Sequence, residues 1–343
     1  AYQTTTLQPR WNAAYNAYNN KHPADSKYSS VRFRGRTKLF RPKTRSTSRK
    51  KAADAAAALF STSDVVIVSA QLPGEEKQAA SAAIVHELLN YRLDRTAANA
   101  GIPWFMISMG AHLTAQQTGV CISKQYWEFK KEHIGYEDVP LVLNGMDLGT
   151  QRKPKYKIVR DRPRIRLYPP EDVIRDPAAA WDDQAHDSSY IILKNGMALG
   201  EAREFINTAN EQSAIVFLDV SDEMLLGSVG VTQQDSGAAA NVRRTREQSG
   251  NDRYNDTNVA TEFRTVWLHE NFIRLNGRDF VFWTLGAETL ISNVVPVAKA
   301  YPEQGGARPI AIGVSAIEPF KIDPMSQILE VLGKELEKPE QGQ

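Results

Sequence analysis

The chain has 343 residues, of which 42 are Lys or Arg, 40 are Asp or Glu and 42% are hydrophobic; this length fits one elaborate domain or two domains. The single cysteine, Cys121, excludes an intramolecular disulfide framework and a zinc site built mainly from thiolates. No apolar run approaches the roughly 18–20 residues of a membrane span and the sequence start lacks a signal-peptide layout, so we expect a soluble, non-secreted protein.

The first 26 residues are polar but contain three aromatic residues, Trp11, Tyr15 and Tyr18, spaced as on one face of a helix. We interpret this stripe as the face by which a helix docks on the body of the chain or on a neighbouring chain. An aromatic ligand-binding box is the less favoured interpretation.

The next segment, Lys27 to Lys51, carries eleven Lys or Arg residues and no acidic residue. With these eleven removed, 31 cations would face 40 acids and the formal net charge would fall from +2 to −9. Such a segment favours a polyanionic or acidic partner, although a solvated basic arm without a partner fits equally well. Gly35 and Pro42 should prevent one continuous helix. The candidate contact residues are Arg32, Arg34, Arg36, Lys38, Arg41, Lys43, Arg45, Arg49, Lys50 and Lys51.

The part of the chain that follows predicts one strand and several helices. An Ala-rich stretch from Lys51 to Phe60 favours a helix, and the apolar run Val65–Val68 predicts a strand. Two helices follow, and the second should begin near Pro103, end at Gly119 and pack one face in the core. The apolar residues at helical spacing are Ile84, Val85, Leu88, Leu89 and Leu93 in the first helix and Ile102, Phe105, Met106, Met109 and Leu113 in the second.

From Val120 onward the pattern changes to strands between turns, so the chain as a whole predicts an α+β fold. Asn276-Gly277 predicts a tight hairpin, and the polar composition of Gly227–Asn258 predicts a long mobile loop. Pro324–Leu336 opens an amphipathic helix, so we expect the sequence to be part of a longer product. The other expected elements are strands at Val120–Phe129, Tyr156–Tyr168 (a half-exposed strand pair), Tyr190–Lys194, Phe263–Ile273 and Phe280–Leu285, and a short helix at Ala198–Ala209.

The sequence contains neither a phosphate-binding glycine loop nor a GxSxG nucleophile elbow. His86-Glu87 begins like a zinc metalloprotease helix, but Asn90 stands where the second histidine would have to be. We therefore assign no catalytic, cofactor-binding or metal-binding residue, and we expect a structural or binding protein rather than an enzyme.

Two alternatives stay open. A nucleic-acid-binding module could work through Arg32–Lys51, with an ordinary surface role favoured for Arg243, Arg244 and Arg246 in the predicted loop. A metal-dependent nucleic-acid enzyme could instead use a cluster of carboxylates. These carboxylates are Glu171, Asp172, Asp176, Asp182, Asp183 and Asp187.

The order of these parts resembles the portal protein, or head-to-tail connector, of tailed bacteriophages, most closely that of short-tailed phages. The resemblance covers roughly residues 10–335, and PPEDVIRDPAAAW is its most specific motif. Its five passages are the N-terminal aromatic and basic run leading into KKAADAAAALFSTSDVVIV, the helix pair ending in TGVCISKQYWEF, then RPRIRLYPPEDVIRDPAAAWDD, FRTVWLHENFIRLNGRDFVFWTLGAETLI and PMSQILEVLGKELE.

The resemblance implies a subunit of a homo-oligomeric ring, typically of twelve copies, at one vertex of the capsid in the virion and in the host cytoplasm during assembly. Double-stranded DNA would pass through the channel during genome packaging and ejection. The partners it implies are the major capsid protein, the terminase large subunit and the head-tail adaptor or tail proteins, with no cofactor and no membrane.

The resemblance also implies a division of the chain. Residues 1–60 would form an N-terminal aromatic and basic arm, 61–130 the wing helices, 131–323 a β-rich wing region and 324–343 the start of a stem helix. The rest of the stem, the clip and the crown are expected beyond Gln343. In such a ring, the helix pair 79–119 and the stripe of Trp11, Tyr15 and Tyr18 are candidate subunit interfaces.

Overall fold

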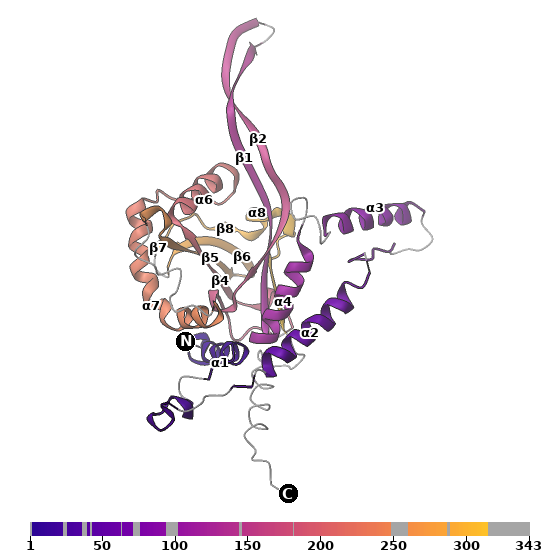
Figure 1. Ribbon diagram of the computed structural model, residues 1–343. Helices are drawn as coiled ribbons and strands as arrows, with labels where there is room; N and C mark the ends of the chain where they lie inside the picture. The colour runs from indigo at the N-terminus through magenta and orange to yellow at the C-terminus, as the bar shows by residue number, and fades with distance from the viewer. Residues whose placement is uncertain are drawn as a thin grey trace.

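The computed structural model describes residues 2–22, 26–35, 40–41, 43–62, 64–70, 76–93, 102–143, 146–180, 182–247, 260–286 and 289–314. Helices come first in the chain and antiparallel sheets follow, which confirms the α+β class (Figure 1). The predicted stem helix at 324–343 lies outside the described residues, as do Arg36 and Lys38 of the basic segment.

The described residues of the N-terminal part are mainly helical. A π-helical turn, Gln3–Leu7, continues into the first α-helix, and two short 3-10 turns stand where the sequence predicts a broken basic segment. Gly119, with φ of 83°, ends α4 as predicted, because glycine adopts this backbone conformation without strain. The helices are α1 (Gln8–Tyr18), α2 (Lys43–Leu59), α3 (Glu76–Arg92) and α4 (Trp104–Thr118).

A long two-stranded hairpin projects from the body of the molecule (Figure 1). Its strands are β1 (Val120–Leu143) and β2 (Met146–Tyr168), and β9 (Ile310–Val314) pairs with the base of β1. The order of this sheet is β2-β1-β9, so β2 is an edge strand. The sequence predicts a strand pair within Tyr156–Tyr168, whereas the structure forms one continuous strand there, paired with β1 along its length.

The second sheet has six strands in the order β3-β4-β5-β6-β7, with β8 paired to β6. Asn276 and Gly277 join β5 to β6 with φ values of 50° and 75°, which confirms the predicted tight turn. The strands are β3 (Val173–Arg175), β4 (Tyr190–Ala198), β5 (Thr265–Leu275), β6 (Arg278–Leu285), β7 (Thr289–Leu290) and β8 (Val295–Pro296). The helices of this part are α5 (Gln184–Asp187), α6 (Leu199–Gln212), α7 (Asp222–Glu247) and α8 (Val297–Ala300).

One hydrophobic core joins this sheet to the helices that cover it. Leu193 of β4 and Leu268 of β5 are fully buried, together with Leu199 of α6. Trp11 and Tyr15 of α1 belong to the same core, so the N-terminal helix docks on the body of its own chain. The sequence predicts that one apolar face of α4 packs in the core. This prediction is only partly correct, because Met106 on that face is 70% exposed.

Two further sequence predictions are wrong. Val65–Val68 forms no strand, and its backbone bonds to side chains of α3 instead. Asn90 accepts from Val65 and Val66 at 2.9 and 3.1 Å and donates to the carbonyl of Val66 at 2.9 Å. Its position in place of a second metal-binding histidine therefore serves to hold this segment.

The predicted loop at Gly227–Asn258 is the second error, since α7 covers its first part up to Glu247. Val242 of α7 is buried in the core, and Thr245 accepts a hydrogen bond from Asn19 at 2.7 Å through its carbonyl oxygen. Packing against the rest of the chain thus overrides the low helix propensity of the Gly, Ser and Asn residues. Residues 248–258 of the predicted loop lie outside the described residues.

Candidate nucleic-acid interface

The described cations of the basic segment lie on the surface without acidic partners. Arg32 and Arg34 lie in the short turns that precede α2, and both are exposed. Six further cations of the segment are described, and all are exposed except Arg45, which is half-buried. No described cation of the segment forms an ion pair with a described acidic residue. The six further cations are Arg41, Lys43, Arg45, Arg49, Lys50 and Lys51.

The first turns of α2 concentrate five of these cations. From Lys43 to Lys51 the helix rises about 12 Å, at 1.5 Å per residue, and Asp54 is its only acidic residue. Arg45 lies with its guanidinium 5.8 Å from the centre of the Tyr18 ring, so α1 and α2 meet at this point. Dense positive charge on one exposed helix is suited to binding successive phosphates of a polyanion.

The sequence analysis favoured an ordinary surface role for the arginines of α7, but the structure pairs two of them with acidic residues of the body. Arg243 is buried and contacts Asp172 at 2.9 Å, and Arg246 lies 3.0 Å from Glu171. Arg243 also lies 4.9 Å from the ring centre of Trp267. These two arginines anchor α7 to the body, and their charges are paired within the chain.

Burial dominates the electrostatics of this anchor. It raises the pKa of Glu171 to about 7, although Arg246 opposes the rise. It also raises the pKa of Asp172 against the effect of Arg243. The hydroxyl of Tyr15 has a pKa raised by burial and by the nearby Glu171, so α1 is part of the same buried cluster.

The carboxylates predicted as a metal site of a nucleic-acid enzyme contact different partners within the chain. Glu171 and Asp172 face α7, while Asp176 accepts from the backbone of Ala178 at 2.9 Å. Asp183 contacts His186 at 2.8 Å, and Asp187 accepts from a backbone amide at 2.7 Å. Among the residues that the structure describes, no group of three or more His, Cys, Asp or Glu side chains could hold a metal ion.

A second arginine-rich feature, on β2, was missed by the sequence interpretation. Arg160, Arg162 and Arg164 share one face of the strand and contact a single carboxylate, Glu128 of β1, at 2.7, 2.9 and 3.0 Å. Burial raises the pKa of Glu128, but hydrogen bonds from Arg162 and Arg160 and the charge of Arg164 outweigh it and lower the pKa. The alternating arginines in RDRPRIR signal this face, because side chains two apart in a strand point the same way.

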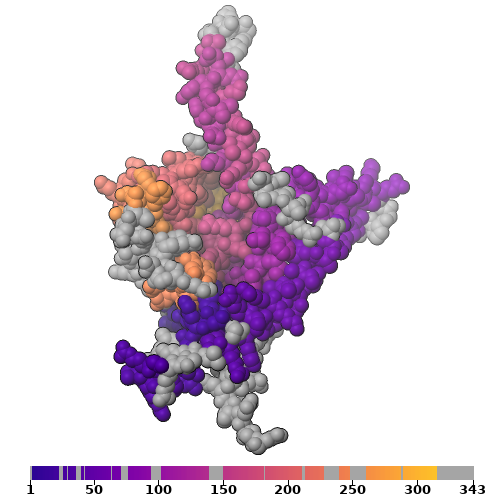
Figure 2. Space-filling view, viewed as in Figure 1, coloured from indigo at the N-terminus to yellow at the C-terminus, as the bar shows by residue number. Residues whose placement is uncertain are grey.

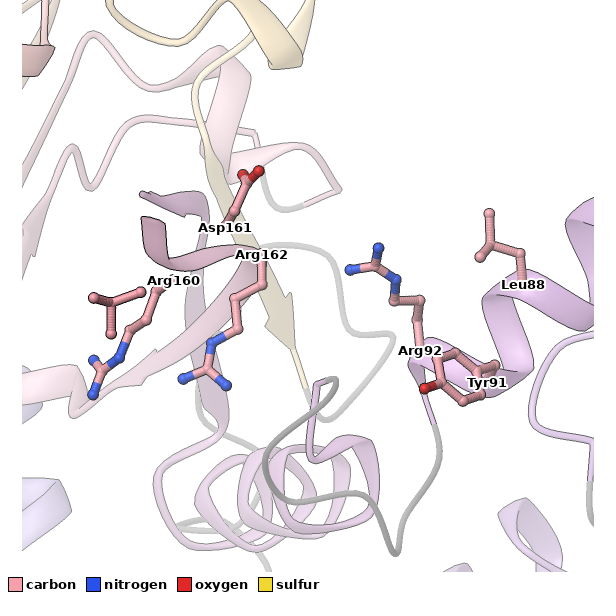
Figure 3. Close-up of a pocket in the computed structure, with 7 residues that line it drawn as sticks. Leu88, Tyr91, Arg92, Arg160, Asp161 and Arg162 are labelled. Atoms are coloured by element: carbon pink, nitrogen blue, oxygen red, sulfur yellow. The ribbon is translucent and has the colours of Figure 1, made fainter. Parts of the chain in front are cut away.

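An open cleft of about 560 Å³ separates this part of β2 from the last turn of α3. Figure 3 shows Arg160 and Arg162 on the side of β2, and Arg92 across from them beside Tyr91. Three guanidiniums and one carboxylate, Asp161, therefore border the cleft. In Figure 1, α3, which forms one wall of the cleft, and α2 lie on the same side of the hairpin.

The aromatic stripe has an intramolecular role for two of its three residues. Trp11 and Tyr15 are 2% and 3% exposed, and the indole nitrogen of Trp11 donates to the carbonyl of Thr118 at 3.0 Å. Only Tyr18, which is half-buried, offers surface to another chain. The subunit interface at these three residues stays a prediction, and burial limits what Trp11 and Tyr15 can contribute to it.

No protein-family model matches the chain, and no curated protein matches it.

Among the described helices, none has both the length and the apolar character that a bilayer-crossing helix requires.

Proposed function

We propose that this chain is a non-enzymatic structural subunit of a bacteriophage portal ring. In that role, identical copies at one capsid vertex surround the DNA during packaging and ejection and join the head to the tail. The sequence resemblance motivates the proposal. The partners would be the major capsid protein, the terminase large subunit and the adaptor or tail proteins.

The observation that carries the proposal is the apolar surface that a single copy leaves uncovered. None of the 17 residues of α3 is buried, although isolated helices of about 12–15 residues are only marginally stable in water. Ile84 and Leu88 of this helix are 68% and 54% exposed. A helix with this composition is suited to packing against a neighbouring protein.

The basic segment supports the same proposal, because it can bind phosphates without reading bases. A conduit must let the duplex slide, and contacts to the phosphate backbone give affinity without sequence specificity. The same cations could bind an acidic neighbouring subunit, since the rest of the chain has a formal net charge of −9.

The mass and the negative-stain image of the purified full-length protein test the proposal directly. We expect closed rings of identical copies, typically twelve. A solitary monomer that turns over a substrate would contradict the proposal. Metal-dependent cleavage of plasmid DNA that Asp182→Ala abolishes would favour the enzyme instead.

The uncompensated cations of α2 favour a second candidate, a nucleic-acid-binding module that acts without forming a ring. Salt titration of binding to duplex DNA, combined with size measurement, separates the two candidates. Tight, salt-sensitive binding by a monomer would support the module, whereas binding found only in the ring fraction would support the portal.

A further inference from the structure

A pocket lies between the N-terminal π-helical turn and the edge strand β3. Its volume is about 360 Å³, at the small end of the range of about 300–1,000 Å³ that is typical of ligand pockets. Figure 2 shows the N-terminal residues, in indigo, against the lower end of the body. Leu7, Ile174 and Pro177 give the pocket an apolar wall, and Tyr2 and Tyr190 also line it.

Arg175 is the one charged residue among the described residues that line this pocket. Its Nη1 donates to Gln184 Oε1 at 2.7 Å, whereas Nη2 is buried and has no hydrogen-bond partner among the described residues. The carboxylate of the next residue, Asp176, accepts from the backbone amides of Ala178 and Ser189 at 2.9 and 3.3 Å instead. No acidic residue that the structure describes forms an ion pair with Arg175.

This setting differs from that of two other enclosed arginines of the chain. Arg243 reaches Asp172 at 2.9 Å, and Arg308 reaches Asp279 at 2.8 Å. A guanidinium taken out of water is stabilised by an anion that accepts its hydrogen bonds. Burial lowers the pKa of Arg175 to about 10, so its charge is poorly compensated within the described chain. A bound anion would provide the missing acceptor.

The lining favours one class of anion. A single cation beside apolar side chains matches a singly charged carboxylate on an apolar body, whereas a phosphate group carries up to two charges and no apolar surface. Gln3 adds a polar contact: its Nε2 donates to the carbonyl of Pro170 at 3.2 Å, and its Oε1 is buried without a partner among the described residues. A hydroxyl or amino group on the ligand could donate to this oxygen.

We propose that the pocket binds a small carboxylate whose body is aromatic or aliphatic. The carboxylate would accept from Nη2 of Arg175, and the body would pack against Leu7 and Ile174. This site does not depend on the proposed ring. Because the ligand would contact both the N-terminal turn and β3, binding should strengthen the contact between these two segments.

Fluorine magnetic resonance of 4-fluorobenzoate, titrated with the full chain, tests the site directly. We expect saturable binding with a Kd of about 1 mM or below. The neutral compound 4-fluorobenzamide has nearly the same shape and should bind at least about tenfold more weakly, because it lacks the charge that Arg175 recognises. Inorganic phosphate should compete with 4-fluorobenzoate only at concentrations at least about tenfold higher than unlabelled benzoate requires.

Substitutions of Arg175 assign this preference to its guanidinium. Arg175→Met keeps an unbranched side chain and should weaken binding of 4-fluorobenzoate about tenfold to a hundredfold, so that the acid and the amide bind alike. Arg175→Lys keeps the charge but loses the planar fork, and it should retain a reduced preference for the acid. Arg278→Met, which removes an exposed arginine of β6, is the matched control and should leave both affinities unchanged.

The outcomes are decisive for this site alone. Equal binding of the acid and the amide by the parent chain, or no saturable binding of the acid up to about 10 mM, would overturn the inference. A preference for the acid that survives Arg175→Met would also overturn it. Should Arg175→Met fail to fold, Arg175→Lys decides, because an unchanged affinity for 4-fluorobenzoate in that variant would contradict the role of Nη2. None of these results bears on whether rings form.

Discussion

The first turns of α2 and the last turns of α7 both carry closely spaced cations, but the structure gives them opposite settings. On α2 the cations are largely exposed, and none forms an ion pair with a described acidic residue. On α7, Arg243 is 4% exposed and bonds to Asp172, and Arg246 lies beside Glu171. The cations of α2 therefore remain available to a partner, whereas Arg243 and Arg246 of α7 are paired with acids of the same chain.

The difference lies in acids that are distant in the sequence. Asp172 lies 71 residues before Arg243, in the turn that leads into β3, and folding brings it against α7. No acidic residue that the structure describes forms an ion pair with the described cations of α2, which lies on the outside of the molecule beside α1 and α4 (Figure 1). Charge clusters in a sequence therefore indicate function only when the fold leaves them unpaired.

The largest expected effect is a loss of stability from Arg243→Ala. This change leaves the carboxylate of Asp172 buried without its partner, and breaking one side of a buried ion pair costs about 3–5 kcal/mol. Urea unfolding should show this loss. The matched change Arg49→Ala, on exposed α2, should alter the free energy of unfolding by less than about 0.5 kcal/mol. Equal losses in the two variants would remove the distinction between the two helices.

The second prediction concerns pH, because burial raises the pKa of Glu171 to about 7. The folded chain holds this proton more tightly than the unfolded chain. The stability that protonated Glu171 contributes is therefore complete below the unfolded pKa of about 4.5, and it is lost as pH rises through about 7. Glu171→Gln, which keeps an uncharged group at this position, should flatten the dependence of stability on pH between 5 and 8, by an amount on the order of 2 kcal/mol.

Urea midpoints measured across this pH range provide the check. Asp54→Asn is a suitable control, since Asp54 is an exposed carboxylate on α2. It should leave the parent pH dependence unchanged. A parent profile that rises between pH 5 and 8 through Glu171 would contradict the assignment, because the sign would then be that of a carboxylate with a lowered pKa.

Local sequence signals predicted the elements whose cause is itself local. Gly119 ends α4 and Asn276-Gly277 forms the hairpin turn, since both need a left-handed backbone that these residues adopt readily. The full length of β1 and β2 was not predictable in this way, because it depends on pairing between residues as far apart as Ile122 and Tyr168. Val65–Val68 shows the converse: its sequence is strand-like, but it pairs with no strand that the structure describes.

The candidate site was predictable to a similar extent. Composition alone located the basic segment, because eleven cations without an acid are visible in the sequence. It could not separate free cations from paired ones. Arg246 and Arg49 have the same chemistry, and only the fold places Glu171 beside the first. The apolar stripe of α3 was also visible as a helix, but its exposure depends on which neighbours the fold leaves out.

The third prediction tests the free cations as a polyanion site. Replacing Arg49, Lys50 and Lys51 by Gln should weaken binding to duplex DNA about tenfold to a hundredfold at moderate salt. It should also reduce the slope of log K against log salt concentration by about 0.9 for each lost phosphate contact. Fluorescence anisotropy over a salt series measures both quantities.

The matched control for binding replaces Arg160, Arg162 and Arg164 by Gln on β2. These arginines share the carboxylate of Glu128, so part of their charge is compensated, and the slope should change less than in the α2 variant. A larger change in the β2 variant would move the polyanion site from α2 to the hairpin and the cleft beside α3.

The smallest expected effect is that of one exposed ion pair on the hairpin. Arg160 is 47% exposed in its side chain and lies 2.7 Å from Glu128, which keeps two other arginines when Arg160 is removed. Arg160→Gln should therefore change the free energy of unfolding by at most about 0.5 kcal/mol. A double-mutant cycle with Glu128→Gln measures the pair alone. A coupling as large as the loss in Arg243→Ala would mean that exposure is not what separates the arginines of this chain.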